Sequence, residues 1–180
     1  DWMDFSPDGK RLATINNSEV KVWDPQTGQQ LLTLSGGDNM ADFSPDGKKI
    51  AAGPRVFDLE TGQELLTLNG VRSVFFSRDG KRLIGFGKEL KVFDAQTGKE
   101  LLSIAAQVGR VATSPDGKWL ASGTPNGEIQ VWDAESGVEI RRFKQHAGPI
   151  TRVTFTHDGA RLVSIGGGTV RIWDAPTKQE

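Results

Sequence analysis

The chain has 180 residues, of which 36% are hydrophobic and 25% are charged, and its formal net charge is −1 at pH 7. This composition is typical of a folded soluble domain, and the near-zero charge provides no broad basic field for nucleic acid. No apolar run approaches the roughly 20 residues of a membrane-spanning helix, and the lack of cysteine excludes disulfides and thiolate chemistry. Composition leaves the compartment open, with the cytoplasm favoured.

The first 34 residues contain three apolar-rich pieces, at 10–15, 19–23 and 29–34, which are separated by turn residues. Before the first of these pieces stands FSPDGK, at 5–10. In this segment Pro7 presets φ for a turn, Asp8 can accept a backbone N–H two residues on, and Gly9 supplies a positive φ. The pattern predicts short β-strands joined by tight turns.

The same unit recurs along the whole chain. FSPDGK returns unchanged at 43–48, with near-copies at 76–81, 113–118 and 155–160. Each copy is followed, at a similar distance, by a strand-end aromatic and an Asp. In the first four repeats a T-G or S-G turn comes next. These markers predict one domain over 1–180 with repeats at about 1–34, 35–68, 69–104, 105–143 and 144–180. The turn residues are Asp8, Gly9, Asp46, Gly47, Asp79, Gly80, Asp116, Gly117, Asp158 and Gly159, and the strand-end aromatics are Trp23, Phe57, Phe93, Trp132 and Trp173.

Alternation within the strands indicates burial on both faces. In EVKVW, Val20 and Val22 share one face while Lys21 and Trp23 share the other. The strands at Leu90/Val92, Ile129/Val131 and Val170/Ile172 repeat this pattern. With no helical period present, we predict an all-β fold of small four-stranded antiparallel sheets, each packed between two neighbours. Radial stacking of such sheets is a β-propeller.

These residues resemble the WD-repeat family of β-propellers. The wording FSPDGKRLA…VKVWDPQTGQQLLTL is more similar to bacterial WD repeats than to eukaryotic ones. The second repeat departs from the family pattern, because Pro54 stands at a strand position and should shorten or kink that blade. The family's usual His survives only as His146, and the resemblance implies a buried network of His146, Ser164 and Trp173 that lacks the usual Asp.

The strand count is four in each of the first four repeats and three in the fifth, where DAPTKQE stands in place of a fourth strand. Two architectures fit this count. Either a five-bladed ring closes with a three-stranded blade, or the 180 residues are an excerpt from a larger propeller. The excerpt is the favoured expectation.

No catalytic signature is present, and we expect neither enzyme activity, nor a metal, nor a cofactor. With no Cys, no Tyr and two distant histidines, His146 and His157, a nucleophile–base pair has few candidates. DGK never completes a phosphate-binding loop, so the turn interpretation is favoured. Strand-end acids could be imagined as a calcium array, but they lack calcium-loop spacing and suit a capping role better: Asp24, Asp58, Asp94, Asp133 and Asp174.

The best candidate for a partner-binding site comes from the starts of the first strand in each repeat. In propellers these starts line the mouth of the central channel. Alignment places there Trp2, Met40, Arg72, Arg110 and Arg152. Arg, Trp and Met are enriched at protein interfaces, and an acidic peptide or carboxylate suits an arginine arc. The alternative is that these residues are a solvated rim.

Three functions remain open at this point. The leading one is a non-enzymatic scaffold that presents loops and a channel mouth to a protein or peptide. The second is a structural module that self-associates, or joins further blades, through open edge strands. The third is a propeller enzyme with its site at the channel mouth, which the shortage of His, Asp, Glu and Tyr at the aligned positions disfavours.

Overall fold

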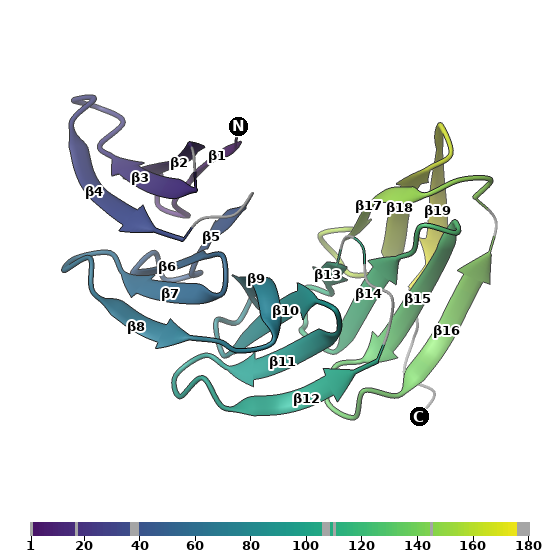
Figure 1. The fold of residues 1–180 in the computed structure, drawn as a ribbon. Helices are drawn as coiled ribbons and strands as arrows, with labels where there is room; N and C mark the ends of the chain where they lie inside the picture. The colour runs from purple at the N-terminus through teal and green to yellow at the C-terminus, as the bar shows by residue number, and fades with distance from the viewer. Residues whose placement is uncertain are drawn as a thin grey trace. The chain divides into compact units, whose positions relative to one another are not determined.

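The computed structural model describes residues 2–16, 18–36, 40–105, 109, 111–144 and 146–175. These residues form nineteen β-strands and no helix, and the strands are arranged in five sheets, A to E (Figure 1). Sheets A to D have four strands each, and sheet E has three. The predicted all-β fold of small antiparallel blades, with three strands in the last, is confirmed.

In each sheet, neighbouring strands follow one another in the chain. Sheet A consists of β1 (Trp2–Phe5), β2 (Leu12–Asn16), β3 (Glu19–Trp23) and β4 (Gln30–Ser35). Sheet B consists of β5 (Ala41–Phe43), β6 (Lys49–Ala52), β7 (Arg55–Asp58) and β8 (Glu64–Thr67). Sheet C consists of β9 (Val71–Phe76), β10 (Arg82–Gly87), β11 (Leu90–Asp94) and β12 (Glu100–Ile104). Sheet D consists of β13 (Val111–Thr113), β14 (Trp119–Gly123), β15 (Glu128–Asp133) and β16 (Glu139–Lys144), and sheet E of β17 (Ile150–Phe155), β18 (Arg161–Gly166) and β19 (Thr169–Asp174).

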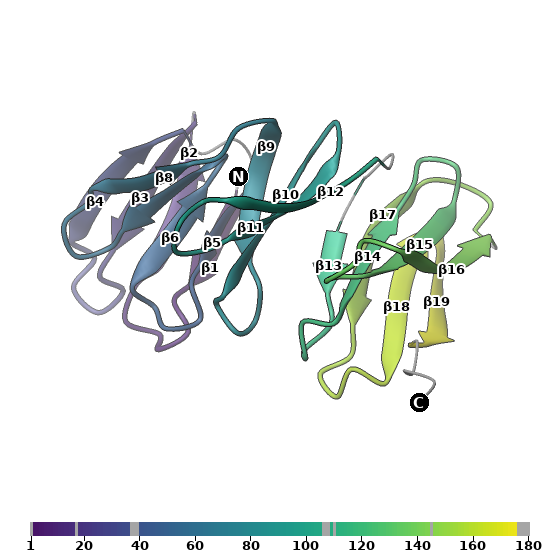
Figure 2. The ribbon, with the colours of Figure 1, turned by 90° about the horizontal axis from the view of Figure 1, so that it is seen from below.

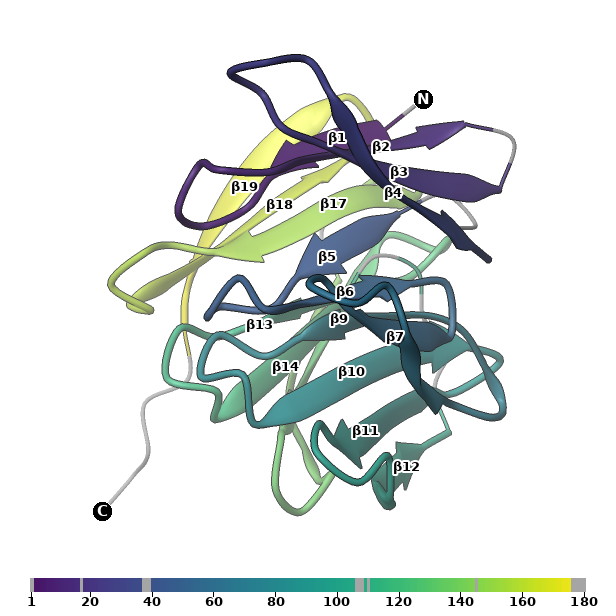
Figure 3. The ribbon, with the colours of Figure 1, turned by 90° about the vertical axis from the view of Figure 1, so that its left-hand side faces the viewer.

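The chain divides into two compact units, Asp1–Leu101 and Leu102–Glu180. In the first unit the innermost strands of sheets A, B and C are neighbours, so that β5 lies between β1 and β9 (Figure 3). In the second unit β17 of sheet E lies against β13 and β14 of sheet D. Within each unit the sheets therefore stack face to face, as the two-sided apolar pattern predicts.

Apolar side chains from facing sheets form the cores. Between sheets A and B, Val20 and Val22 join Phe43 in one buried cluster. Between sheets D and E, Ile129 and Val131 join Phe155 in another. A third cluster fills the space between sheets B and C. Since each such side chain contributes about 1.5–3 kcal/mol on burial, these clusters supply most of the stabilisation of the stack.

The recurring SPDGK segment forms the same hydrogen-bonded turn in each sheet. In sheet A the Ser6 hydroxyl donates to Asp8 Oδ1 at 2.6 Å, and the same carboxylate oxygen accepts the backbone N–H of Lys10 at 3.0 Å. Ser6 Oγ accepts the N–H of Arg11 at 2.9 Å, and Gly9 takes a φ of 69°. These hydrogen bonds hold the pKa of Asp8 below its usual value. The six letters repeat because this local network is built again in every blade.

The acid that follows each strand-end aromatic closes the next turn. Asp24 Oδ1 accepts the backbone N–H groups of Gln26 and Thr27, at 2.8 and 3.2 Å. Gly28, which completes that turn, has a φ of 72°. The corresponding acids Asp58, Asp94 and Asp133 accept hydrogen bonds in the same manner. The carboxylate oxygens of these acids therefore accept backbone hydrogen bonds. For Asp24, the bonds from Gln26 and Thr27 lower its pKa.

Sheet B has the short strands that its sequence predicts. Both β6 and β7 have four residues, and Gly53 and Pro54 form the connection between them. Gly53 has a φ of 60°, and a Cβ there would lie 2.2 Å from the carbonyl oxygen of Gly36. The proline, which lacks a backbone N–H, instead uses its carbonyl to accept the N–H of Leu68 at 2.8 Å. The expected shortening is confirmed.

The strand-end aromatics match a residue of the second strand that lies two positions beyond their cross-strand partner. The indole Nε1 of Trp23 donates to Thr14 Oγ1 at 2.8 Å, and a hydroxyl thus satisfies a partly buried donor. In sheet C the aromatic is Phe93, which has no donor, and the matching residue is Gly85. A Cβ on Gly85 would approach the Phe93 ring to 3.0 Å. The repeats therefore pair tryptophan with a hydroxyl and phenylalanine with a small residue.

Candidate protein-interaction site

The residues predicted at the channel mouth fall in both units. In the first unit, Trp2 opens β1, Met40 directly precedes β5, and Arg72 is the second residue of β9. Because β5 lies between β1 and β9, these three residues stand at the starts of neighbouring strands. In the second unit Arg152 is an exposed residue of β17. Arg110 lies outside the described residues.

The three residues of the first unit differ in how much of their surface is available. Arg72 is exposed, whereas Trp2 and Met40 are half-buried. Trp2 packs against the apolar cluster between sheets A and B, so part of the indole belongs to the core. The aligned tryptophan is therefore both a structural and a candidate contact residue. Arg72 is the exposed cationic residue among these three.

A second feature of the innermost strands was not predicted. Asp42, on β5, is half-buried, and its Oδ2 accepts the backbone N–H of Phe76, on β9, at 2.7 Å. Burial raises the pKa of Asp42 to about 6, the Phe76 hydrogen bond opposes this shift, and the charge of Asp4 on β1 adds to it. The sequence signal was an acid directly before the phenylalanine that ends the first strand of two consecutive repeats, Asp4 before Phe5 and Asp42 before Phe43.

A cavity of about 340 Å³ lies between the D-G turns of sheets B and C. Its walls include Pro45 and Asp46 from one turn and Phe76 and Asp79 from the other. Both carboxylates already accept hydrogen bonds from their own turns, and these bonds lower the pKa of each. Neither acid has the raised pKa that a general acid at neutral pH requires. The cavity is best explained as a gap between two structural turns.

His146 belongs to a buried structural network in sheet E. Its Nδ1 lies 2.8 Å from the carbonyl oxygen of Gly166, which can only accept, so Nδ1 carries the proton. Its Nε2 then accepts the Ser164 hydroxyl at 2.7 Å, while Ser164 Oγ accepts Trp173 Nε1–H at 2.9 Å. Thr169 Oγ1 lies 3.0 Å from the same Nδ1. The three predicted members meet, and the Ser164 hydroxyl at Nε2 is fully buried and also holds the Trp173 indole, which suits a structural role.

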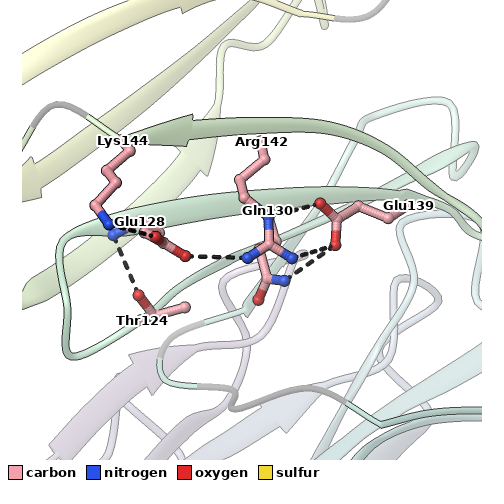
Figure 4. A network of polar contacts seen from close by, with 6 residues as sticks. All are labelled: Thr124, Glu128, Gln130, Glu139, Arg142 and Lys144. Atoms are coloured by element: carbon pink, nitrogen blue, oxygen red, sulfur yellow. Dashed lines mark hydrogen bonds and ion pairs between the residues drawn. The ribbon is translucent and has the colours of Figure 1, made fainter.

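An exposed polar network lies on the outer strands of sheet D (Figure 4). Arg142, on β16, donates through Nε and Nη2 to the two oxygens of Glu139, at 2.8 Å each, and through Nη1 to Glu128 at 3.1 Å. Glu128 also pairs with Lys144 at 3.2 Å, and Gln130 Nε2 donates to Glu139 at 3.1 Å. The carboxylates raise the pKa of Arg142 further. The two cations, Arg142 and Lys144, and the two carboxylates, Glu128 and Glu139, neutralise one another.

The residues that the structure describes lack two further features. They contain no group of three or more His, Asp or Glu side chains placed to hold a metal ion. They also contain no helix of the length and apolarity required to cross a membrane.

Comparison with protein families finds WD40 repeats, described as WD domain, G-beta repeat, at residues 98–133 and 137–174. These ranges cover β12 to β15 and β16 to β19. The repeats matched are those that carry the Trp-Asp pairs at 132–133 and 173–174.

The chain is also similar to parts of several longer proteins. It is 35% identical over 89 residues to the pre-rRNA-processing protein crb3/ipi3 of Schizosaccharomyces pombe, which covers 49% of this chain and 18% of that protein. It is 33% identical over 63 residues to pre-mRNA-processing factor 19 homolog 2 of Arabidopsis thaliana, a match that covers 35% of this chain and 12% of that protein. It is 34% identical over 112 residues to protein groucho of Drosophila melanogaster, a match that covers 58% of this chain and 15% of that protein. The chain thus spans less than a fifth of each relative, and these eukaryotic proteins give no support to a bacterial type of repeat.

Proposed function

Because the chain belongs to the WD-repeat family of β-propeller proteins, we propose that it is a non-enzymatic protein-interaction scaffold. The contact surface that we assign is the end of the first unit at which β1, β5 and β9 start. The occupant is an acidic peptide segment of a partner protein, since a guanidinium binds carboxylates through paired, charge-assisted hydrogen bonds.

The observation that carries this proposal is the placement of Arg72 beside Met40. The exposed guanidinium stands at the start of β9, next to the strand that Met40 precedes. Met is an adaptable apolar contact, and Arg is enriched in interface hot spots. Relatives of the chain include proteins of pre-rRNA and pre-mRNA processing, and work in such assemblies suits a scaffold. The buried, fully bonded His146 supports a non-enzymatic role.

β9 itself offers a matched control for the test. Arg78 is exposed in the D-G turn at the other end of the strand, about 20 Å away at about 3.3 Å per residue. Binding of a fluorescein-labelled Asp/Glu-rich peptide would be followed by fluorescence anisotropy at low and high salt. Arg72→Glu should weaken binding by about 10-fold or more, and Arg78→Glu by less than about 3-fold. Equal losses would mean non-specific charge attraction and would refute the assigned surface.

A second candidate function is assembly through sheet E. In the described part of the chain β19 pairs with β18 alone, and its outer edge is open (Figure 2). An open edge strand offers unpaired N–H and C=O groups to another strand. Through these groups β19 would pair with a strand of a second copy of the chain or with a strand of a further blade. The solution mass of the chain over a range of concentrations tests this function.

A further inference from the structure

Several glycines of the chain directly follow an aspartate or an asparagine. In such a pair the backbone nitrogen of the glycine can attack the side-chain carbonyl carbon of the preceding residue and close a cyclic imide, because glycine has no side chain that obstructs the approach. The pairs are the five D-G turns and two Asn-Gly pairs, at 69–70 and 126–127. A glycine N–H that donates a hydrogen bond must release it before it reacts.

The D-G turns resist this reaction. The Gly47 N–H donates to the carbonyl oxygen of Ser44 at 2.8 Å, and the other four turns have the equivalent bond at 2.8 or 2.9 Å. Hydrogen bonds from the Ser44 hydroxyl and the Lys48 N–H lower the pKa of Asp46. At neutral pH its side chain is therefore an ionised carboxylate, which is a poor target for a nucleophile.

The Asn126–Gly127 pair, between β14 and β15, is also restrained. The Gly127 N–H donates to the carbonyl oxygen of Thr124 at 3.2 Å. Gly127 is buried, and a Cβ on it would lie 2.3 Å from the carbonyl oxygen of His146 and 2.9 Å from that of Gly148. Because backbone atoms surround this glycine, its nitrogen has little room to rotate toward the Asn126 side chain.

The Asn69–Gly70 pair joins β8 to β9 without these restraints. Both residues are exposed, and within the described ranges the Gly70 N–H donates no hydrogen bond. Gly70 and Gly127 have almost the same φ, 78° and 79°, so the difference between the two pairs lies in their contacts. The atoms nearest to a Cβ on Gly70 would be Cε and Nζ of Lys91, at 3.4 Å, which form the flexible end of a side chain.

We propose that Asn69 is a site of spontaneous modification that adds a negative charge beside the peptide-binding surface. The Gly70 nitrogen loses its proton and attacks the side-chain carbonyl carbon of Asn69, and the side-chain nitrogen leaves as ammonia. Water then opens the imide at either carbonyl and returns a proton to the Gly70 nitrogen. The product is aspartate or isoaspartate, and both carry one carboxylate. Because the attacking nitrogen must lose a proton, the conversion should accelerate as the pH rises.

The new charge appears close to Arg72. Asn69 stands three residues before Arg72, so their Cα atoms lie at most about 11 Å apart. This span is comparable with the Debye length of about 10 Å at moderate salt, so a carboxylate at position 69 repels an acidic peptide bound at Arg72. The effect on binding rests on the proposed function, whereas the modification of Asn69 does not.

The first test compares the two Asn-Gly pairs within one chain. Wild-type protein is incubated in its folded state and then digested with trypsin, which releases residues 56–72 and 119–141, each with a single asparagine. Mass spectrometry measures the fraction of each peptide in the acid form. Asn69 should convert at least about 10-fold faster than Asn126, which must first lose the Gly127 hydrogen bond and its backbone packing.

Incubation of the released peptides is the control. Without the fold, the two pairs should convert at similar rates. Equal rates in the folded chain, or a faster reaction at Asn126, would overturn the assignment. A rate difference that persists in the isolated peptides would assign it to the neighbouring residues in the sequence, and would also overturn it.

The second test measures binding of the labelled acidic peptide by fluorescence anisotropy. Asn69→Asp carries the new charge from the start and should bind about 2- to 5-fold more weakly than fresh wild type at low salt, and equally at high salt. Asn69→Gln keeps an amide on a longer side chain, so its affinity should stay constant during incubation. Gln96→Glu adds the same charge in the T-G turn at the other end of sheet C, and should lose less than about 2-fold.

The outcomes of the two tests separate the modification from the proposed function. Equal affinities of Asn69→Asp and wild type, while Arg72→Glu weakens binding, would overturn the effect of the charge on the surface. If Arg72→Glu has no effect, the proposed peptide surface fails and the effect on binding fails with it. The conversion rates of Asn69 and Asn126 then still decide the modification site.

Discussion

Asp42 should make the stability of the first unit depend on pH. In the folded chain its pKa lies at about 6, because burial disfavours the carboxylate and the neighbouring charge of Asp4 disfavours it further. In the unfolded chain the ordinary value of 3.8 applies. As the pH rises, the unfolded state loses this proton first, so it binds fewer protons than the folded state between the two values. The free energy of unfolding therefore falls as the pH rises through this window.

The magnitude follows from the separation of the two pKa values. A difference of about two units, at about 1.4 kcal/mol each, gives a loss of about 3 kcal/mol between pH 4 and pH 7. Asp42→Asn keeps a carbonyl oxygen that can accept the Phe76 N–H and cannot ionise. Relative to this variant, wild type should lose about 3 kcal/mol over that range.

Urea denaturation followed by circular dichroism, at several pH values for both proteins, measures this difference. The turn acids, such as Asp8, have the same lowered pKa in both proteins, so their contributions to the pH dependence cancel in the comparison. Asp4→Asn provides a second check, since removal of that charge should move the midpoint of the wild-type transition to lower pH. Parallel pH profiles for wild type and Asp42→Asn would refute the reasoning.

Three further substitutions test the fold. Ser164→Ala removes the hydroxyl that both Trp173 and His146 use, and should lower the free energy of unfolding by about 1–3 kcal/mol in urea titrations, whereas Ser164→Thr should retain part of it. Gly53→Ala forces a Cβ to within 2.2 Å of a carbonyl oxygen at a positive φ and should cost more than about 1 kcal/mol, so an unchanged melting temperature would contradict the turn geometry. Arg142→Gln breaks exposed ion pairs, and its small effect on the melting temperature should shrink as salt is added.

Much of the fold could be predicted because its determinants are local. A serine, an aspartate and a glycine within four residues specify the D-G turn, and the structure builds it from hydrogen bonds inside that segment. Pro54 predicted the short strands of sheet B because a proline lacks the N–H that a strand ladder needs. Strand alternation likewise predicted two apolar faces per sheet.

Part of the candidate site depended on distant contacts. Asp42 meets the backbone of Phe76, 34 residues later in the chain, and its raised pKa arises from the neighbouring sheets. Trp2 aligns with rim residues in the other repeats, yet its indole packs into the core between sheets A and B. Neither outcome is contained in the local pattern of β1 or β5.

The amino-acid sequence by itself determined the repeats, their turns and the two-sided strands, because each is encoded within a few residues. Only the tertiary structure decided which apolar faces are covered. Val20 and Val170 stand in equivalent strands with the same alternation, and one is buried while the other is 63% exposed. The difference lies in the neighbouring sheet. Burial depends on packing between elements, and the sequence of a strand does not show whether another sheet covers it.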